Sequence, residues 1–161
     1  MIEFSQESVN FLRDAALNSP PDLASDLIET ANKLEMQIHL FDDIMSENNG
    51  IPTGIELKKE LDDKFVVILE DCLEIGSFRA IYFDPDGFIG HTVNSLCDDL
   101  LKEVISEGYT VQTAGVLDFL SKTDRWKKGM KKSSIRDAYN QGLIGFDLML
   151  DQFKNIEEGM A

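Results

Sequence analysis

The chain has 161 residues, of which 43% are hydrophobic and 28% charged, and its formal net charge is −15 at pH 7. This composition excludes a disordered chain, and we expect residues 1–161 to form a single globular domain. The sequence has no run of about 18 apolar residues, and its first residues lack the basic and apolar regions of a secretory signal. We therefore expect a cytoplasmic protein with no membrane contact.

Two helices are predicted in the first 50 residues. Ser5 can cap a first helix that runs through Val9 and Ala16 until the prolines of "NSPP" stop it. A second helix is predicted from Asp22 to "ENNG", because apolar residues recur there every three or four positions. These residues are Leu27, Ala31, Leu34, Ile38, Phe41 and Met45. Residues 34–40 also alternate in polarity, so a strand is the second choice for that segment.

The central segment changes to a pattern typical of strands. The sequence "GIELKKELDD" predicts a short exposed helix, and "KFVVILEDCLEI" predicts a strand that is covered on both faces. Two β-prone runs then flank Asp84-Pro85-Asp86-Gly87. Proline, aspartate and glycine each favour a tight turn, so residues 78–93 predict a β-hairpin.

Four further elements are predicted towards the C-terminus. Asn94 can cap a helix in "SLCDDLLKEVISEG" that ends at Gly108. The segment "YTVQT" is a predicted strand, and Thr113 can cap a short helix in "AGVLDFLSK". A basic segment follows, interrupted by Gly129, and we expect it to form a loop and the first turn of the final helix. Ser133 or Ser134 is expected to begin that helix.

These elements favour the α+β class, with helices packed on a small, mainly antiparallel sheet that contains the hairpin at about residues 78–93. A three-layer α/β arrangement stays open as the alternative. In that arrangement the helix at 95–107 and the strand at 109–113 would continue the sheet in parallel.

Acidic residues dominate the first three quarters of the chain. Residues 1–121 carry 24 acidic and 7 basic side chains, a net charge of −17. The carboxylates at positions 99, 103 and 107 recur at the spacing of one helix face, and a second dense region spans residues 56–74. One interpretation is a solvated surface, and the other is a face that binds a basic protein. The candidate acidic face comprises Asp62, Asp63, Glu70, Asp71, Asp98, Asp99, Glu103 and Glu107.

The basic residues gather in one window. Residues 122–136 hold 7 of the 15 basic side chains and have a net charge of +6. Such a patch stays positive locally because the Debye length is about 8 Å at physiological ionic strength. It can pair with the protein's own carboxylates, or contact an acidic partner or a second subunit. A nucleic acid, with Trp126 stacked on a base, is disfavoured by the net charge. The candidate patch comprises Arg125, Trp126, Lys127, Lys128, Lys131 and Lys132.

No pattern in the sequence predicts catalysis, a cofactor or a metal. The motifs GxGxxG, GxxxxGK[ST], HExxH and GxSxG are absent. The "DPDG" sequence resembles the centre of a calcium loop, but Tyr82 and Val93 would occupy positions that require Asp and Glu. His39 has Glu35, Asp42 and Asp43 at helical spacing, which we interpret as an acidic surface rather than a metal site. Cys72 and Cys97 lack CxxC spacing and are expected to be buried, unreactive thiols.

The sequence therefore favours a binding protein over an enzyme. We expect an acidic cytoplasmic protein that neutralises a basic protein partner, in the manner of inhibitors and immunity proteins that block nuclease toxins. Two alternatives stay open. One is a small enzyme with an unrecognised pocket that uses His91 or Cys72, and the other is a homo-oligomeric structural subunit.

Overall fold

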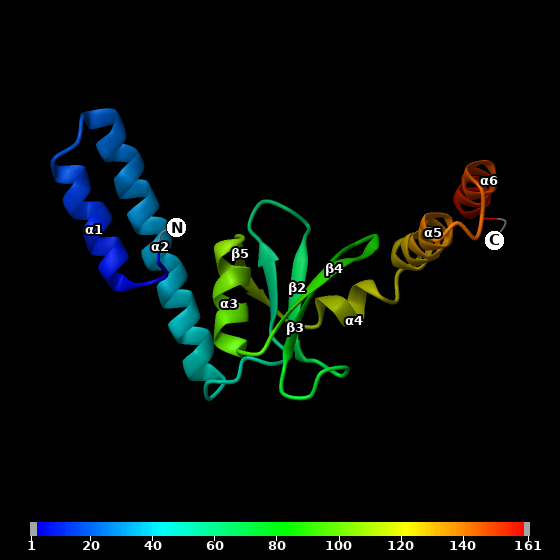
Figure 1. Ribbon diagram of the computed structural model, residues 1–161, viewed down its shortest axis with the longest axis horizontal. Coiled ribbons are helices and arrows are strands. Elements are labelled where there is room, and N and C mark those ends of the chain that lie inside the picture. The colour runs from blue at the N-terminus through cyan, green and yellow to red at the C-terminus, as the bar shows by residue number, and fades with distance from the viewer. Residues whose placement is uncertain (1–2, 160–161) are drawn as a thin grey trace.

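The computed structural model describes residues 3–159, which form helices packed on a five-stranded antiparallel sheet (Figure 1). The sheet order is β4-β3-β2-β1-β5. The elements are α1 (Gln6–Leu17), α2 (Pro21–Glu47), β1 (Glu56–Lys59), β2 (Phe65–Glu70), β3 (Phe78–Asp84), β4 (Gly87–Asn94), α3 (Cys97–Ser106), β5 (Tyr109–Thr113), α4 (Val116–Leu120), α5 (Asp124–Asn140) and α6 (Phe146–Glu157). The α+β prediction is confirmed. The parallel alternative is wrong, because β5 pairs antiparallel with β1.

The two N-terminal helices agree with the prediction. The Ser5 hydroxyl accepts a hydrogen bond from the backbone N–H of Ser8 at 3.2 Å and so caps α1. The apolar stripe of α2 packs against α1, where Val9 and Ala31 are both fully buried. The strand alternative for residues 34–40 is wrong, since that segment lies inside α2.

The segment expected to form a short exposed helix, "GIELKKELDD", contains β1 instead. β1 lies between β2 and β5 and pairs antiparallel with both, and Leu57 is fully buried in the core. Pairing on both sides supplies the backbone hydrogen bonds that a helix would otherwise make. Tertiary pairing therefore outweighs the helix propensity of Glu, Leu and Lys.

Apolar side chains cover both faces of the sheet, as predicted for β2. Val66 and Ile68 point to one face, and Phe65 and Val67 point to the other, because strand side chains alternate. The first face packs against α2 and α3, and its fully buried residues are Ile44, Leu57, Val66, Ile68, Ala80, Leu100, Leu101, Val104 and Ile105. The second face packs against α4 and α5, and its buried residues are Phe65, Val67, Phe83 and Trp126.

The β3–β4 hairpin is confirmed, and its turn has the predicted chemistry. The carboxylate of Asp84 accepts a hydrogen bond from the backbone N–H of Asp86 at 2.7 Å. Gly87 has a φ of +129°, a conformation that favours glycine. The strands pair from Phe78 opposite Asn94 to Asp84 opposite Gly87.

Two predicted helix caps are wrong. Asn94 accepts a hydrogen bond from the backbone N–H of Leu96 at 3.1 Å, but Leu96 itself holds the cap position of α3. Thr113 does not cap α4, whose cap residue is Gly115. The first backbone N–H groups of α4 instead donate to the buried carboxylate of Glu56 on β1, from Val116 at 2.7 Å and from Leu117 at 3.3 Å. A long-range carboxylate thus replaces the local cap.

Replacing Glu56 with alanine should lower the free energy of unfolding by about 2 kcal/mol. The change removes two charge-assisted hydrogen bonds and leaves the α4 N–H groups without their acceptor. Urea unfolding followed by circular dichroism measures the loss. Glu70→Ala is the control, because Glu70 is exposed at the end of β2, and its effect should stay within about 0.5 kcal/mol. Equal effects of the two substitutions would contradict this role for Glu56.

The basic segment is helical, which corrects the predicted loop and the predicted start of the final helix. The Thr123 hydroxyl accepts a hydrogen bond from the backbone N–H of Trp126 at 3.1 Å and caps α5. α5 then continues through Ser133 and Ser134, so neither serine begins a helix. Gly129 and the many polar residues suggested a loop. The packing of Trp126 against the sheet stabilises the helix instead.

The molecule is elongated, with a pair of helices at each end of the sheet (Figure 1). Helices α1 and α2 lie at one end, and α5 and α6 lie at the other. Within residues 3–159, no helix combines the length and the apolar character needed to cross a membrane.

Candidate functional site

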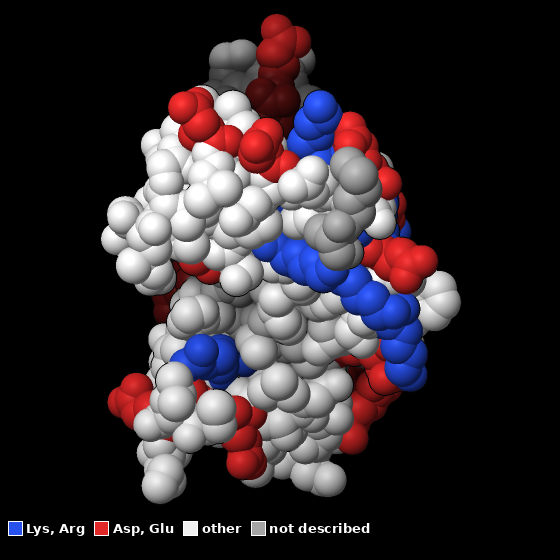
Figure 2. Space-filling model, turned by 90° about the vertical axis from the view of Figure 1, so that its right-hand side faces the viewer, with Lys and Arg blue, Asp and Glu red and all other residues white. Residues whose placement is uncertain are grey.

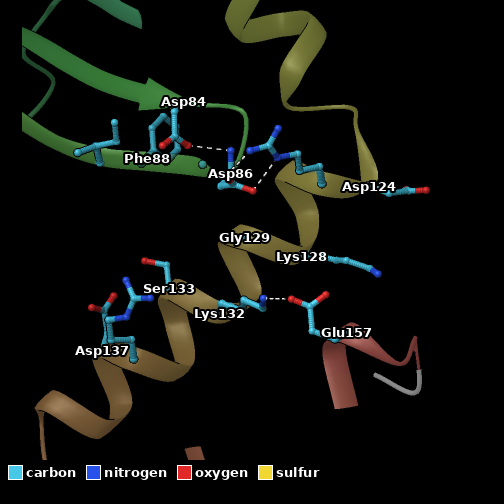
Figure 3. A pocket seen from close by; sticks show the side chains of 14 residues that line it. Asp84, Asp86, Phe88, Asp124, Lys128, Gly129, Lys132, Ser133, Asp137 and Glu157 are labelled. Carbon is cyan, nitrogen blue, oxygen red and sulfur yellow. Dashed lines mark hydrogen bonds and ion pairs between the residues drawn. The ribbon is translucent and has the colours of Figure 1, made fainter. Parts of the chain in front are cut away.

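A hollow of about 920 Å³ lies between the β3–β4 turn, α5 and α6 (Figure 3). We call it the hairpin hollow. One face of α5 supplies the cations Arg125, Lys128, Lys132 and Arg136, and the acids are Asp84, Asp86, Asp124, Asp137 and Glu157. The view onto this end of the molecule shows a band of basic side chains with acidic ones beside it (Figure 2).

Two ion pairs join residues that line the hairpin hollow. Arg125 donates two hydrogen bonds to Asp86, at 2.8 and 2.6 Å, and this interaction lowers the pKa of the Asp86 carboxyl. Lys132 pairs with Glu157 across the gap between α5 and α6, and it lowers the pKa of that carboxyl. The basic segment therefore pairs in part with the protein's own carboxylates.

Trp126 is buried and contacts two aromatic rings of the hairpin. Its exposed fraction is 5%, and its ring lies edge-on to Phe83 at 6.1 Å and to Phe88 at 5.1 Å between centroids. The stacking of Trp126 on a nucleic-acid base is therefore excluded in this conformation. Of the other predicted basic residues, Lys127 lies 3.7 Å from Asp124, and Lys131 is exposed on α5.

The predicted acidic face does not form one surface. Asp71 is buried at the end of β2, where it pairs with Arg79 at 3.0 Å and accepts a hydrogen bond from the backbone N–H of Leu73 at 2.8 Å. These bonds, that from Leu73 first, lower the pKa of Asp71. Asp71 is a structural residue, whereas its neighbour Glu70 is exposed.

Three other predicted acids form ion pairs near the surface. Lys102 lies 3.7 Å from both Asp98 and Asp99 on α3, and Lys58 lies 2.9 Å from Asp63. Such pairs contribute little to stability because solvent screens them. They reduce, without removing, the negative charge that these residues present.

The remaining predicted acids come together at one end of the sheet. The rings of Tyr82 and Tyr109 lie 5.5 Å apart there. Burial, and then the charge of Glu107, raises the pKa of both tyrosines. Glu103 adds to the effect on Tyr82, and Asp62 adds to that on Tyr109. Asp62, Glu103 and Glu107 are exposed, so three carboxylates border this tyrosine pair.

A second hollow, of about 770 Å³, lies between α2, the β1–β2 turn and β5. We call it the α2–β5 hollow. Three of its apolar residues face solvent, with exposed fractions of 73% for Met36, 95% for Leu61 and 42% for Val111. The charged residues that line it are Glu29, Lys33, Lys59, Glu60 and Asp62. Solvent-facing apolar side chains thus lie among three carboxylates and two lysines.

The comparisons with known proteins give no match. No family model fits the chain, and no significant similarity to a curated protein or to a solved structure is found. Any functional assignment therefore depends on the chemistry of the surface.

The histidines and cysteines considered for metal binding or catalysis lie outside the two hollows. Glu35 binds Arg13 at 2.7 Å, and no group of three or more His, Cys, Asp or Glu residues that could hold a metal occurs within residues 3–159. His91 and Cys72 are exposed and line neither of the two hollows described above. The buried-thiol prediction is wrong for Cys72. Cys97 is buried, and burial raises its pKa to about 11.

Asp62 was a predicted site residue, whereas the exposed apolar residues of the α2–β5 hollow were not predicted. Met36 belongs to the alternation at residues 34–40 that left a strand open, and Leu61 lies in the segment predicted to be a short exposed helix. The sequence did contain one signal for this hollow. Leu61 is an isolated apolar residue between Glu60 and Asp62, and it belongs to no apolar period. Its closeness to Val111 depends on the pairing of β1 with β5, which is a long-range feature.

Proposed function

We propose that this chain is a binding protein that holds a basic protein partner at the α2–β5 hollow and neutralises it, as an inhibitor of a nuclease toxin would. One observation carries the proposal. Met36, Leu61 and Val111 are exposed beside the carboxylates of Glu60 and Asp62. Apolar anchors within a charged rim are typical of protein-binding surfaces.

A basic partner fits this chemistry better than an acidic one. A lysine or arginine has an apolar stem and a cationic head, so it can cover Leu61 while its charge meets Asp62. Six of the seven acidic residues of α2 lack an ion-pair partner within residues 3–159 and add to the negative field. That field would raise the association rate, and the gain would fall as salt rises.

The test is affinity capture of basic proteins from the source cells, followed by calorimetry with each purified candidate. The double variant Leu61→Ser/Asp62→Asn should weaken binding by at least about tenfold, since it removes an apolar anchor and a charge. Raising the salt concentration should slow association in the unmodified protein.

A matched control is available at the opposite end of β2. Leu73 is 81% exposed and Glu74 is exposed, so Leu73→Ser/Glu74→Gln makes the same kinds of change outside the hollow. Its affinity should stay within about twofold of the unmodified protein. Equal losses in the two double variants, or a partner that binds regardless of salt, would count against the proposal.

A further inference from the structure

Helices α5 and α6 form a two-helix unit at one end of the molecule, which we call the C-terminal hairpin. The first turns of α5 join it to the sheet through Trp126 and Met130. α6 packs along α5, and Met149 and Ile156 are its buried residues, with 8% and 4% exposed. Several other apolar residues of the C-terminal hairpin are exposed to solvent.

An apolar patch lies near the loop of the C-terminal hairpin. The exposed fractions are 38% for Tyr139, 72% for Leu143, 53% for Phe146 and 47% for Leu150. The rings of Tyr139 and Phe146 lie 6.0 Å apart, and Leu150 follows Phe146 by one helical turn. Tyr139, Phe146 and Leu150 are therefore neighbours, and Leu143 lies in the loop between the two helices, where its backbone N–H donates to the carbonyl oxygen of Ala138. A broad uncharged area next to the basic band is visible on this side of the molecule (Figure 2).

Two packed helices cannot bury an apolar stripe that faces away from both of them. Helical proteins solve this problem by adding further helices, and the four-helix bundle is the common arrangement. Exposed apolar patches of this kind usually mark an interface. The C-terminal hairpin supplies half of such a bundle.

The charges of the C-terminal hairpin indicate what covers the patch. α5 has six basic and two acidic residues, a net charge of +4, while α6 has one basic and three acidic residues, a net charge of −2. Arg136 on α5, and Asp147 and Asp151 on α6, have no ion pair within residues 3–159. A second hairpin related by a two-fold axis can place its α6 against this α5 and its α5 against this α6. The surface is thus complementary to itself.

We propose that the chain forms a two-fold dimer in which the C-terminal hairpins of two copies pack into a four-helix bundle through Tyr139, Leu143, Phe146 and Leu150. The interface lies apart from the α2–β5 hollow, so the dimer is independent of the proposed partner. A second copy is favoured over a different protein because α5 of one copy meets the oppositely charged α6 of the other, and the reverse pairing follows from the two-fold axis.

The test is sedimentation equilibrium of the full chain. The unmodified protein should sediment at twice the 18.1 kDa of one chain, and Phe146→Asp should raise the dimer dissociation constant by at least about tenfold. Phe11→Asp is the matched control, because Phe11 is 72% exposed on α1 at the other end, and it should leave the dimer intact. Circular dichroism should give the same helix content for all three proteins.

A second variant tests the charge argument without altering the apolar patch. Asp147→Lys/Asp151→Lys gives α6 the same sign of charge as α5, so it should also favour the monomer. The dimer of the unmodified protein should weaken between about 0.05 and 0.5 M NaCl. A monomeric unmodified protein at about 0.1 mM, as expected if another protein covers the patch, would overturn the proposal. A dimer that Phe11→Asp disrupts and Phe146→Asp does not would also overturn it.

Discussion

Replacing Gly129 with alanine should lower the free energy of unfolding by about 3 kcal/mol or more. A Cβ at this position would overlap the carbonyl oxygen of Asp86 and lie 2.6 Å from its carbonyl carbon. The obstacle is backbone, so no side-chain rotation relieves it, and either the β3–β4 turn or α5 must move. In an exposed helix the same substitution stabilises by about 1 kcal/mol, so the expected sign is the reverse of the helix-propensity effect.

Urea unfolding and the fluorescence of the chain's one tryptophan measure this effect together. Trp126 lies three residues before Gly129, so displacement of α5 should shift its emission to longer wavelength as the ring contacts water. Gly90→Ala is the control, because Gly90 lies on β4 with no atom within 4 Å of an added Cβ and no positive φ. Its effect should stay within about 0.5 kcal/mol. A Gly129→Ala protein as stable as the unmodified one would show that α5 does not contact the turn this closely.

Elements specified by nearby residues were predicted correctly. The apolar period of residues 27–45 identified α2, and the Asp-Pro-Asp-Gly sequence identified the turn between β3 and β4. In each case one short stretch of sequence contains both the pattern that predicts the element and the residues that end it. The α+β class followed, because these elements do not alternate as a parallel sheet requires.

Features that depend on distant partners were not predicted, although the short helix α4 itself was. β1 is a strand because β2 and β5 flank it, and α4 is capped by Glu56, which lies 60 residues earlier in the sequence than Val116. The burial of Asp71 was missed for the same reason, because its partner Arg79 is brought to it by the fold. The α2–β5 hollow joins three segments that only the sheet order brings together, so no local pattern could reveal it.

Replacing Trp126 with alanine should lower the free energy of unfolding by about 3 to 5 kcal/mol, which is a large share of the stability of a typical domain. The indole is 95% buried by the ring contacts with Phe83 and Phe88, and its loss leaves a cavity between α5 and the sheet. Its position within the basic segment follows from this packing, because Trp126 holds α5 where Arg125 reaches Asp86.

Because the alanine variant can unfold, Trp126→Phe is the second variant, with an expected loss of about 1 to 2 kcal/mol. Phe119→Ala is the matched control, since Phe119 is an aromatic residue of the adjacent α4 that is 67% exposed, and its effect should stay within about 0.5 kcal/mol. Circular dichroism in urea serves for all three, as two of them lack the tryptophan. If Trp126→Ala unfolds at the same urea concentration as Phe119→Ala, the ring does not join α5 to the sheet, and the basic segment must be held by its ion pairs instead.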